Sequence, residues 1–181
     1  METNVRPYKN NYPLLGQRVY LDSSAVVIGQ VRVGDDSSIW PLVSIRGDVN
    51  CITIGQRSNI QDGSILHVTR TSEEDSQGFP LYIGDDVTVG HHATLHGCIL
   101  KNRILIGMGS IVLDGAIIED DVMLAAGSLV PPRKTLTSGF LYVGSPAKPA
   151  RALTDKELTF LRQSANNYVV LKDEYLNEAS G

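Results

Sequence analysis

All four histidines of the chain, His67, His91, His92 and His96, fall within one stretch of about thirty residues. Neutral imidazole nitrogens bind zinc at about 2.0–2.1 Å, and three such ligands with an open fourth position form a catalytic zinc site. The clustering therefore indicates a metal site. For any single one of these histidines the alternative is an ordinary surface or interface residue. Which of the two holds depends on where the strands and turns place each side chain.

Those elements follow from a repeat of six residues. A period of six fits neither the 3.6-residue turn of a helix nor a two-residue alternation, but it suits a short strand followed by a tight turn. Three hexads would make one triangular coil of about 18 residues, and successive coils would stack as parallel strands about 4.8 Å apart. The expected inward positions are all aliphatic: Val33, Ile39, Ile45, Ile54, Ile60, Leu66, Ile83, Val89, Leu95, Leu100, Ile106, Val112, Ile118, Leu124 and Val130.

His67 and His96 occupy equivalent positions in this repeat. Leu66 is the third inward residue of its coil, Leu95 is the third of the next coil, and each is followed by a histidine. The two histidines should therefore stack on the same edge of the prism. A separation near 4.8 Å between their backbones lets both imidazoles converge on one ion.

His91 lies in the preceding hexad, two places after Val89, and is turned toward a different edge. It should not reach an ion held by His67 and His96 of its own subunit. A ring of three chains solves this problem, because His91 of one subunit can complete the site that its neighbour begins. His92 is expected to be adjacent in a strand, to point the opposite way from His91, and to bind no metal.

Several strings of the sequence resemble the γ-class carbonic anhydrases and their bacterial YrdA-like relatives: IRGDVN, SNIQDGSILH, VGHHATLHG, GMGSIVLDGAIIEDDV, VGSPAKPAR and ANNYVVLKDEYL. The resemblance implies a mainly β fold, the left-handed parallel β-helix of hexapeptide repeats with a C-terminal α-helix, assembled as a homotrimer. It also implies Zn²⁺, or Fe²⁺ or Co²⁺, bound by His67, His96 and the neighbouring chain's His91. The implied reaction is the hydration of carbon dioxide to bicarbonate by a metal-activated hydroxide.

The same resemblance assigns roles to six polar residues: Arg46, Asp48, Asn59, Gln61, Asp62 and Tyr168. It implies an ion pair between Arg46 and Asp48 near the subunit interface. Gln61, Asp62 and Tyr168 are the candidate catalytic residues: Gln61 would hydrogen-bond bicarbonate or the water at the metal, and Asp62 would orient Arg46. The alternatives are a polar turn around Asn59 that satisfies backbone groups, and a helix-packing role for Tyr168.

The chain departs from the archetypal γ-class enzyme at two glutamate positions, one in the acidic loop and one three residues after the first ligand histidine. It has Val49 and Arg70 there, so hydration would be slow or absent unless water or another side chain exports the proton. Two alternatives stay open: a hexapeptide-repeat acyltransferase that uses acyl-CoA, and a non-catalytic metal-binding or scaffold trimer. The missing glutamates favour the scaffold, whereas Gln61 favours an enzyme.

Length and composition set the remaining expectations. The 181 residues are predicted to form a single domain, 1–181, with a lead-in over about 1–20, a β-helix over about 21–150 and a C-terminal helix over about 155–177 that begins at the capping box TDKE. A net charge of −4 without a basic run argues against a nucleic-acid partner. Without a membrane-spanning stretch or an apolar N-terminal segment, a cytoplasmic protein with no membrane partner is expected. Its two cysteines should be reduced.

Overall fold

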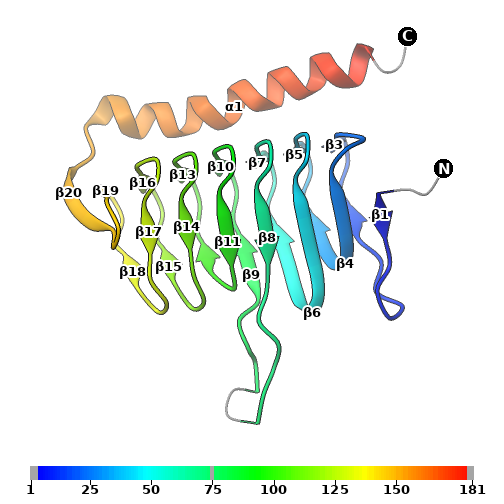
Figure 1. Cartoon of the computed structure of the whole chain (residues 1–181). Helices are drawn as coiled ribbons and strands as arrows, with labels where there is room; N and C mark the ends of the chain where they lie inside the picture. The colour runs from blue at the N-terminus through cyan, green and yellow to red at the C-terminus, as the bar shows by residue number, and fades with distance from the viewer. Residues whose placement is uncertain (1–3, 74–75, 179–181) are drawn as a thin grey trace.

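The computed structural model describes residues 4–73 and 76–178, in which short strands wind into a three-sided prism (Figure 1). One sheet forms the first side of the prism. Its strands, all parallel except for the final pair, are β3 (Tyr20–Leu21), β5 (Ser38–Ile39), β7 (Asn59–Ile60), β10 (Thr88–Val89), β13 (Leu105–Ile106), β16 (Met123–Leu124), β19 (Phe140–Val143) and β20 (Lys148–Ala152).

A second sheet forms the other two sides. Strand β6 (Ser44–Ile54) passes from one side to the other, because it pairs with β8 (Ile65–His67) near its start and with β9 (Leu81–Ile83) near its end. The strands of this sheet are β1 (Val5–Arg6), β2 (Leu14–Leu15), β4 (Val26–Val33), β6 (Ser44–Ile54), β8 (Ile65–His67), β9 (Leu81–Ile83), β11 (Thr94–His96), β12 (Ile99–Leu100), β14 (Ile111–Val112), β15 (Ile117–Ile118), β17 (Leu129–Val130) and β18 (Thr135–Leu136).

The core is a column of aliphatic side chains inside the prism. None of the fifteen predicted inward residues is more than 3% exposed. They lie in register on successive coils, as in the run Ile45, Leu66, Leu95, Val112 and Val130. The predicted fold class, a left-handed parallel β-helix of hexapeptide repeats with a C-terminal α-helix, is confirmed.

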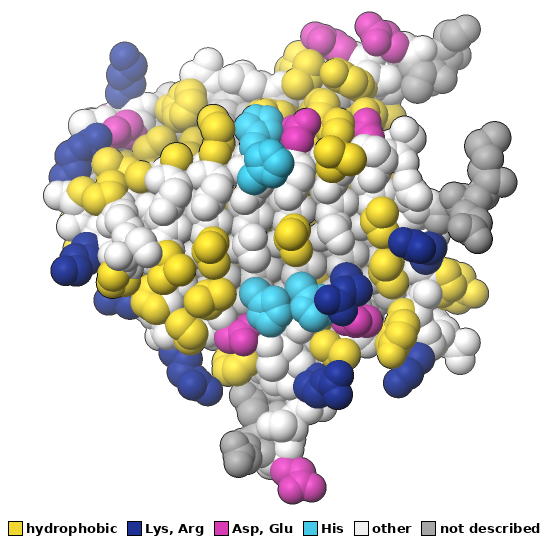
Figure 2. Space-filling model, viewed as in Figure 1, with side chains coloured by type: hydrophobic (Ala, Val, Ile, Leu, Met, Phe, Trp, Pro, Cys, Tyr) yellow, Lys and Arg dark blue, Asp and Glu magenta, His cyan; other side chains and the backbone are white. Residues whose placement is uncertain are grey.

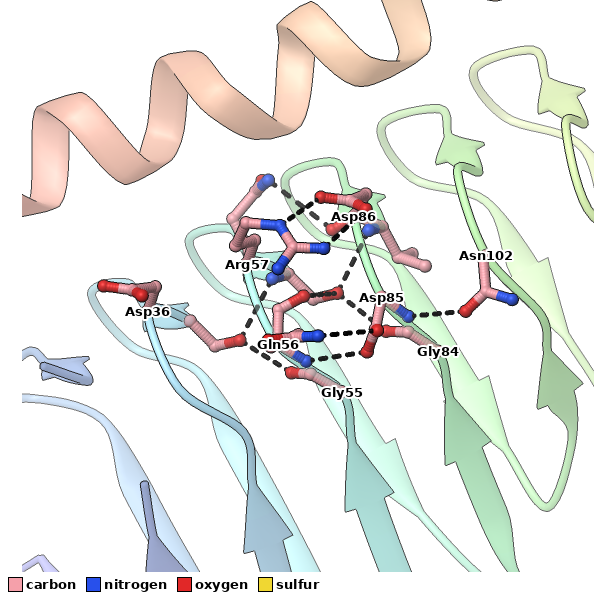
Figure 3. Close-up of polar contacts among 12 residues, drawn as sticks. Asp36, Gly55, Gln56, Arg57, Gly84, Asp85, Asp86 and Asn102 are labelled. Atoms are coloured by element: carbon pink, nitrogen blue, oxygen red, sulfur yellow. Dashed lines mark hydrogen bonds and ion pairs between the residues drawn. The ribbon is translucent and has the colours of Figure 1, made fainter. Parts of the chain in front are cut away.

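Charged side chains link the coils along one edge of the prism (Figure 3). Arg57 binds Asp86 through two hydrogen bonds, from Nε to Oδ1 at 2.7 Å and from Nη2 to Oδ2 at 2.9 Å. Arg103 and Asp121 repeat this pair two coils further on. Each carboxylate takes up two guanidinium donors, so the pairs hold neighbouring corners together in a fixed geometry.

Two segments depart from the regular coils. The N-terminal segment, expected as a lead-in to about residue 20, contributes strands β1 and β2, and both pair with β4. Between β8 and β9 the described residues 70–73 and 76–78 leave the prism (Figure 1), and this part of the chain is called the 70–78 excursion. Backbone hydrogen bonds in both directions between Thr69 and Phe79, at 3.0 and 3.1 Å, close the base of this excursion.

Helix α1 (Asp155–Glu178) begins directly after Thr154 of the capping box TDKE. The backbone nitrogen of Thr154 donates to Glu157 Oε2 at 2.9 Å, and the backbone nitrogen of Glu157 donates to Thr154 Oγ1 at 3.3 Å. These reciprocal bonds satisfy amide groups that the first turn of a helix leaves unpaired. Within the described residues, α1 is not apolar enough to cross a membrane.

The helix packs along the side of the prism formed by β3, β5 and β10. Trp40 contacts the rings of Tyr168 and Tyr175 with centroid distances of 5.5 and 5.2 Å. Lys172 is completely buried, and its Nζ lies 3.0 Å from Asp36 Oδ1 at a corner of the prism. The helix is thus fixed to the coils by aromatic contacts and by a partly buried ion pair.

Candidate metal site

His67 and His96 lie directly opposite each other on the paired strands β8 and β11. Their ring centroids are 5.1 Å apart, and the distance from His67 Nδ1 to His96 Nε2 is 3.1 Å. The parallel register expected from the repeat is therefore present. Two nitrogens that bind one tetrahedral zinc ion at about 2.0–2.1 Å lie about 3.3 Å from each other, so the observed spacing suits a shared ion.

The outer nitrogen of each ring contacts a carboxylate. His67 Nε2 lies 3.1 Å from Asp48 Oδ1, and His96 Nδ1 lies 2.6 Å from Asp114 Oδ1. An ionised carboxylate can only accept a hydrogen bond, so in the neutral rings the protons belong on these outer nitrogens. The lone pairs of the inner nitrogens then face each other, and such an arrangement requires a cation or a proton between them.

His67 takes up a second proton less readily than an ordinary histidine. Burial of His67, together with the positive charge of Arg46 and the nearby His96, outweighs the attraction of Asp48 and lowers the pKa of His67 below its usual value. The ring therefore stays neutral at physiological pH, as a metal ligand must. The two residues consequently fit a divalent metal ion.

Arg46 and Asp48 extend from β6 beside this pair. Arg46 Nη1 donates to Asp48 Oδ2, so the ion pair expected near the interface forms within a single chain. Burial raises the pKa of Asp48, but hydrogen bonds from Arg46 and His67 outweigh it and leave that pKa below its ordinary value. Asp48 is therefore a carboxylate that can orient His67.

His91 belongs to a different part of the surface. Its Nδ1 lies 2.9 Å from Asp62 Oδ2, so this ring also contacts a carboxylate. His91 borders a pocket of about 220 Å³ whose lining includes Gln61 and Tyr168. The pocket lies between the coils and helix α1, since Ser164 and Tyr168 of the helix form one of its walls.

A hydrogen-bonded chain anchors Gln61 in this pocket. Gln61 Nε2 donates to Asn59 Oδ1 at 3.0 Å, and Asn59 Nδ2 donates to Thr88 Oγ1 at 3.0 Å. The hydroxyls of Thr88 and Ser164 are 3.1 Å apart, which connects the chain to helix α1. Asn59 thus does more than satisfy a turn, because it fixes the amide of Gln61.

Tyr168 combines the two roles considered for it. Its ring packs against Trp40, and the side chain also borders the pocket with His91 and Gln61. Burial, helped by the charge of Asp62, raises the pKa of Tyr168, so its hydroxyl keeps its proton at neutral pH. Tyr168 can therefore donate a hydrogen bond to a ligand in the pocket.

Figure 2 shows the histidines in two separate groups on one side of the molecule. No cluster of three or more His, Cys, Asp or Glu side chains suitable for a metal occurs in residues 4–73 and 76–178. A single chain thus presents a two-histidine half site and, apart from it, a one-histidine half site. Within the chain Asp62 contacts His91 and Arg46 contacts Asp48, so the expected action of Asp62 on Arg46 stays a prediction about an assembled protein.

The expectation for His92 needs a correction. His91 and His92 lie in the turn between β10 and β11, where His92 has a φ of 56°, and not in a strand. Strand alternation therefore does not determine where these two side chains point. The reason is that the second and third residues after an inward aliphatic form the corner of the coil.

Asp114 was missed by the sequence analysis, although it makes the shorter of the two carboxylate contacts to the histidine pair. A count of six residues per hexad places Leu113, the residue after Val112, above His96. The step from Leu95 to Leu100 is only five residues, however, and at this corner Asp114 reaches His96. That irregular step is the signal in the sequence that could have revealed it.

These features define a hexapeptide-repeat protein of the parallel β-helix class that carries a paired-histidine site. The chain is 61% identical to protein YrdA of Escherichia coli over 99% of its own length and 98% of that protein. It is 44% identical to mitochondrial gamma carbonic anhydrase 2 of Arabidopsis thaliana over 93% of the chain and 60% of that protein. A solved structure of a hexapeptide transferase family protein from Anaplasma phagocytophilum superposes with a TM-score of 0.88, at 39% identity, over 97% of this chain and 99% of the other.

The chain therefore belongs to the γ-carbonic-anhydrase-like family of hexapeptide-repeat proteins, the family that includes YrdA. No family model matches the sequence.

Proposed function

We propose that the protein is a homotrimeric γ-carbonic-anhydrase-like metalloenzyme that hydrates carbon dioxide to bicarbonate. The observation that carries this proposal is the pair of facing nitrogens, His67 Nδ1 and His96 Nε2, which lie 3.1 Å apart while their outer nitrogens contact Asp48 and Asp114. Zinc is the proposed metal, with Fe²⁺ or Co²⁺ as alternatives, because imidazole suits each of them. When bound, such an ion lowers the pKa of water enough to supply hydroxide at neutral pH.

The third ligand in this proposal is His91 of an adjacent subunit. Its Nδ1 contacts Asp62, so its Nε2 carries the free lone pair and is available to a metal. The surface of β8 and β14 is apolar, with Ile65 50% exposed and Ile111 37% exposed. A neighbouring subunit that covers this surface would remove it from water and bring the two half sites together.

The residues of the pocket suit the proposed substrate and product. Leu105, Ile106 and Met108 offer an apolar wall to carbon dioxide, which has no charge. The amide of Gln61, held by Asn59, would hydrogen-bond bicarbonate. Arg46 would attract the anion at the assembled site, and Tyr168 would donate a further hydrogen bond.

An acyltransferase is the first alternative, and the name of the Anaplasma relative favours it. Its general base would be one histidine, but here both His67 and His96 carry a carboxylate partner and face each other. A thermal-shift and turnover screen with acetyl-CoA distinguishes this alternative. A non-catalytic metal-binding trimer is the second, and Val49 and Arg70 at the glutamate positions favour it.

Stopped-flow measurement of carbon dioxide hydration tests the proposal. The trimer is purified anaerobically, its metal is determined by elemental analysis, and it is then assayed after loading with zinc, iron or cobalt. We expect hydration above the rate of the free ion, and loss of that excess in His96→Ala. A metal-loaded trimer no faster than the free ion would refute the enzymatic proposal and leave the metal-binding trimer.

A further inference from the structure

Asp114 lies at a corner of the prism where it contacts two groups at once. Its Oδ1 lies 2.6 Å from His96 Nδ1, and its Oδ2 accepts a hydrogen bond from Thr69 Oγ1 at 3.0 Å. Both carboxylate oxygens are therefore engaged. The contacts join residues from three separate parts of the chain: the strand β11, the corner after β14, and the base of the 70–78 excursion.

The surroundings of Asp114 fix its position. Thr69 cannot move freely, because its carbonyl accepts hydrogen bonds from the Phe79 backbone nitrogen and from Asn50 Nδ2, at 3.1 and 3.0 Å. Gly97 leaves room for the carboxylate, since a Cβ at that position would collide with Asp114 Oδ1. Gly97 also has a φ of 52°, which other residues rarely adopt.

The contact decides which nitrogen of His96 carries the proton. With Asp114 accepting from Nδ1–H, the lone pair of Nε2 faces His67 Nδ1 at 3.1 Å. Without this carboxylate, His96 could place its proton on Nε2 and donate it to His67 Nδ1. That hydrogen bond would occupy both inner nitrogens and leave no lone pair for a cation.

We infer that Asp114, held by Thr69, is a positioning residue that keeps the proton of His96 on Nδ1 and directs the Nε2 lone pair toward His67. The consequence for metal affinity rests on the proposed function. The inference about the tautomer of His96 does not rest on the proposed function, because the tautomer is a property of the metal-free protein. The two can therefore be measured separately.

The first measurement is the ¹⁵N NMR spectrum of the histidine side chains in the metal-free protein. Wild type should show the Nδ1–H form of His96, and Asp114→Ala should shift it toward the Nε2–H form. Asp114→Leu, which is similar in size and has no hydrogen-bond acceptor, serves as a second variant if the alanine variant does not fold. Glu119→Gln removes a carboxylate on the same coil that contacts Lys101, and it should leave the His96 signals unchanged. An unchanged tautomer in folded Asp114 variants would overturn the inference.

The second measurement is zinc affinity, determined by competition with a chelator. Loss of a carboxylate that orients a metal-bound histidine typically costs about 10-fold to 100-fold in affinity, so this is the loss expected for Asp114→Ala. Thr69→Val should lose less, and Glu119→Gln should match wild type. If wild type binds zinc and Asp114→Ala binds it equally well, the inference fails and the proposed function stands. If wild type binds no zinc but the tautomer shifts as expected, the proposed function fails and the inference stands.

Discussion

His67 Nδ1 and His96 Nε2 face each other across 3.1 Å, and each ring is fixed from behind by an aspartate. His91 also contacts an aspartate, Asp62, although it lies elsewhere on the chain. The same arrangement thus occurs at all three candidate ligands. A carboxylate behind each imidazole sets its orientation and raises its basicity toward a metal.

Replacement of His96 by alanine should abolish metal binding with little effect on folding. The fold depends on the buried aliphatic column, and His96 points away from it. Elemental analysis of purified protein should give about one metal per chain for wild type, the full occupancy of a closed trimer, and none for His96→Ala. His92→Ala is the matched control and should keep its metal. Full metal content in His96→Ala would refute the ligand assignment.

A subunit-mixing experiment should reveal whether the site is shared between chains. His91→Ala chains lack one half site, and His96→Ala chains lack the other, so neither variant alone should bind metal. After random assembly of an equal mixture, each mixed trimer regains one intact site, and the expected metal content is about one quarter of wild type. Recovery of none would indicate a site that lies within one subunit.

Replacement of Gln61 by leucine should slow hydration while the metal stays bound. Gln61 is 5% exposed and its amide is held by Asn59, so it offers a fixed hydrogen bond and no metal contact. Loss of one such fixed hydrogen-bonding group typically lowers kcat by about 100-fold. The measurement is stopped-flow hydration with metal content determined on the same samples. Equal kcat in the variant would remove Gln61 from the reaction.

The stability that Asp36 contributes should disappear in acid. Hydrogen bonds from Arg18 and then Lys172 outweigh burial and lower the pKa of Asp36 from 3.8 to about 2. Because this pKa is lower in the folded protein than in the unfolded chain, the stabilisation is complete above pH about 4 and is lost as pH falls through 2. Asp36→Asn tolerates the same positive φ of 58° and removes only the charge.

The comparison of melting temperatures checks this effect. Wild type should melt above Asp36→Asn at pH 5, and the difference should vanish only below pH about 2. A difference that is constant between these pH values would show that the carboxylate charge contributes nothing.

The two cysteines should differ in reactivity. Cys98 is completely buried, and burial raises the pKa of its thiol, whereas Cys51 is partly exposed beside the hydroxyl of Tyr82. Thiol reagents attack the thiolate, so one thiol per chain should react in the native protein and two in denaturant. Cys51→Ser should show no rapid native reaction. Rapid modification of both thiols in native wild type would contradict the packing of Cys98.

The sequence predicted the fold well because one rule governs most of the chain. Each inward aliphatic, such as Leu66 or Leu95, must lie above the equivalent residue of the previous coil, so the six-residue period determines register and core together. The capping box at Thr154 similarly located the start of helix α1. The pairing of β1 and β2 with β4 could not be predicted, because these strands of two residues carry no repeat.

The site was predictable only where it follows the period. His67 and His96 are separated by one coil and therefore meet, whatever the length of the excursion between them. Asp114 and Thr69 depend on a shortened corner and on the closure of the excursion, which are local exceptions to the repeat. The contact of Asp62 with His91 likewise depends on the backbone conformation of the two corners that carry them, and the residue types alone do not predict this conformation.

The β-helix sets the distance between His67 and His96. The spacing between the two imidazoles equals the pitch of one coil, so additions or deletions of whole coils near either end would leave it untouched. One extra coil inserted between Leu66 and Leu95 would separate the two backbones by a further 4.8 Å or so, too far for a single ion to bridge. Insertions and deletions of whole coils should therefore be tolerated at the two ends of the β-helix and forbidden between Leu66 and Leu95.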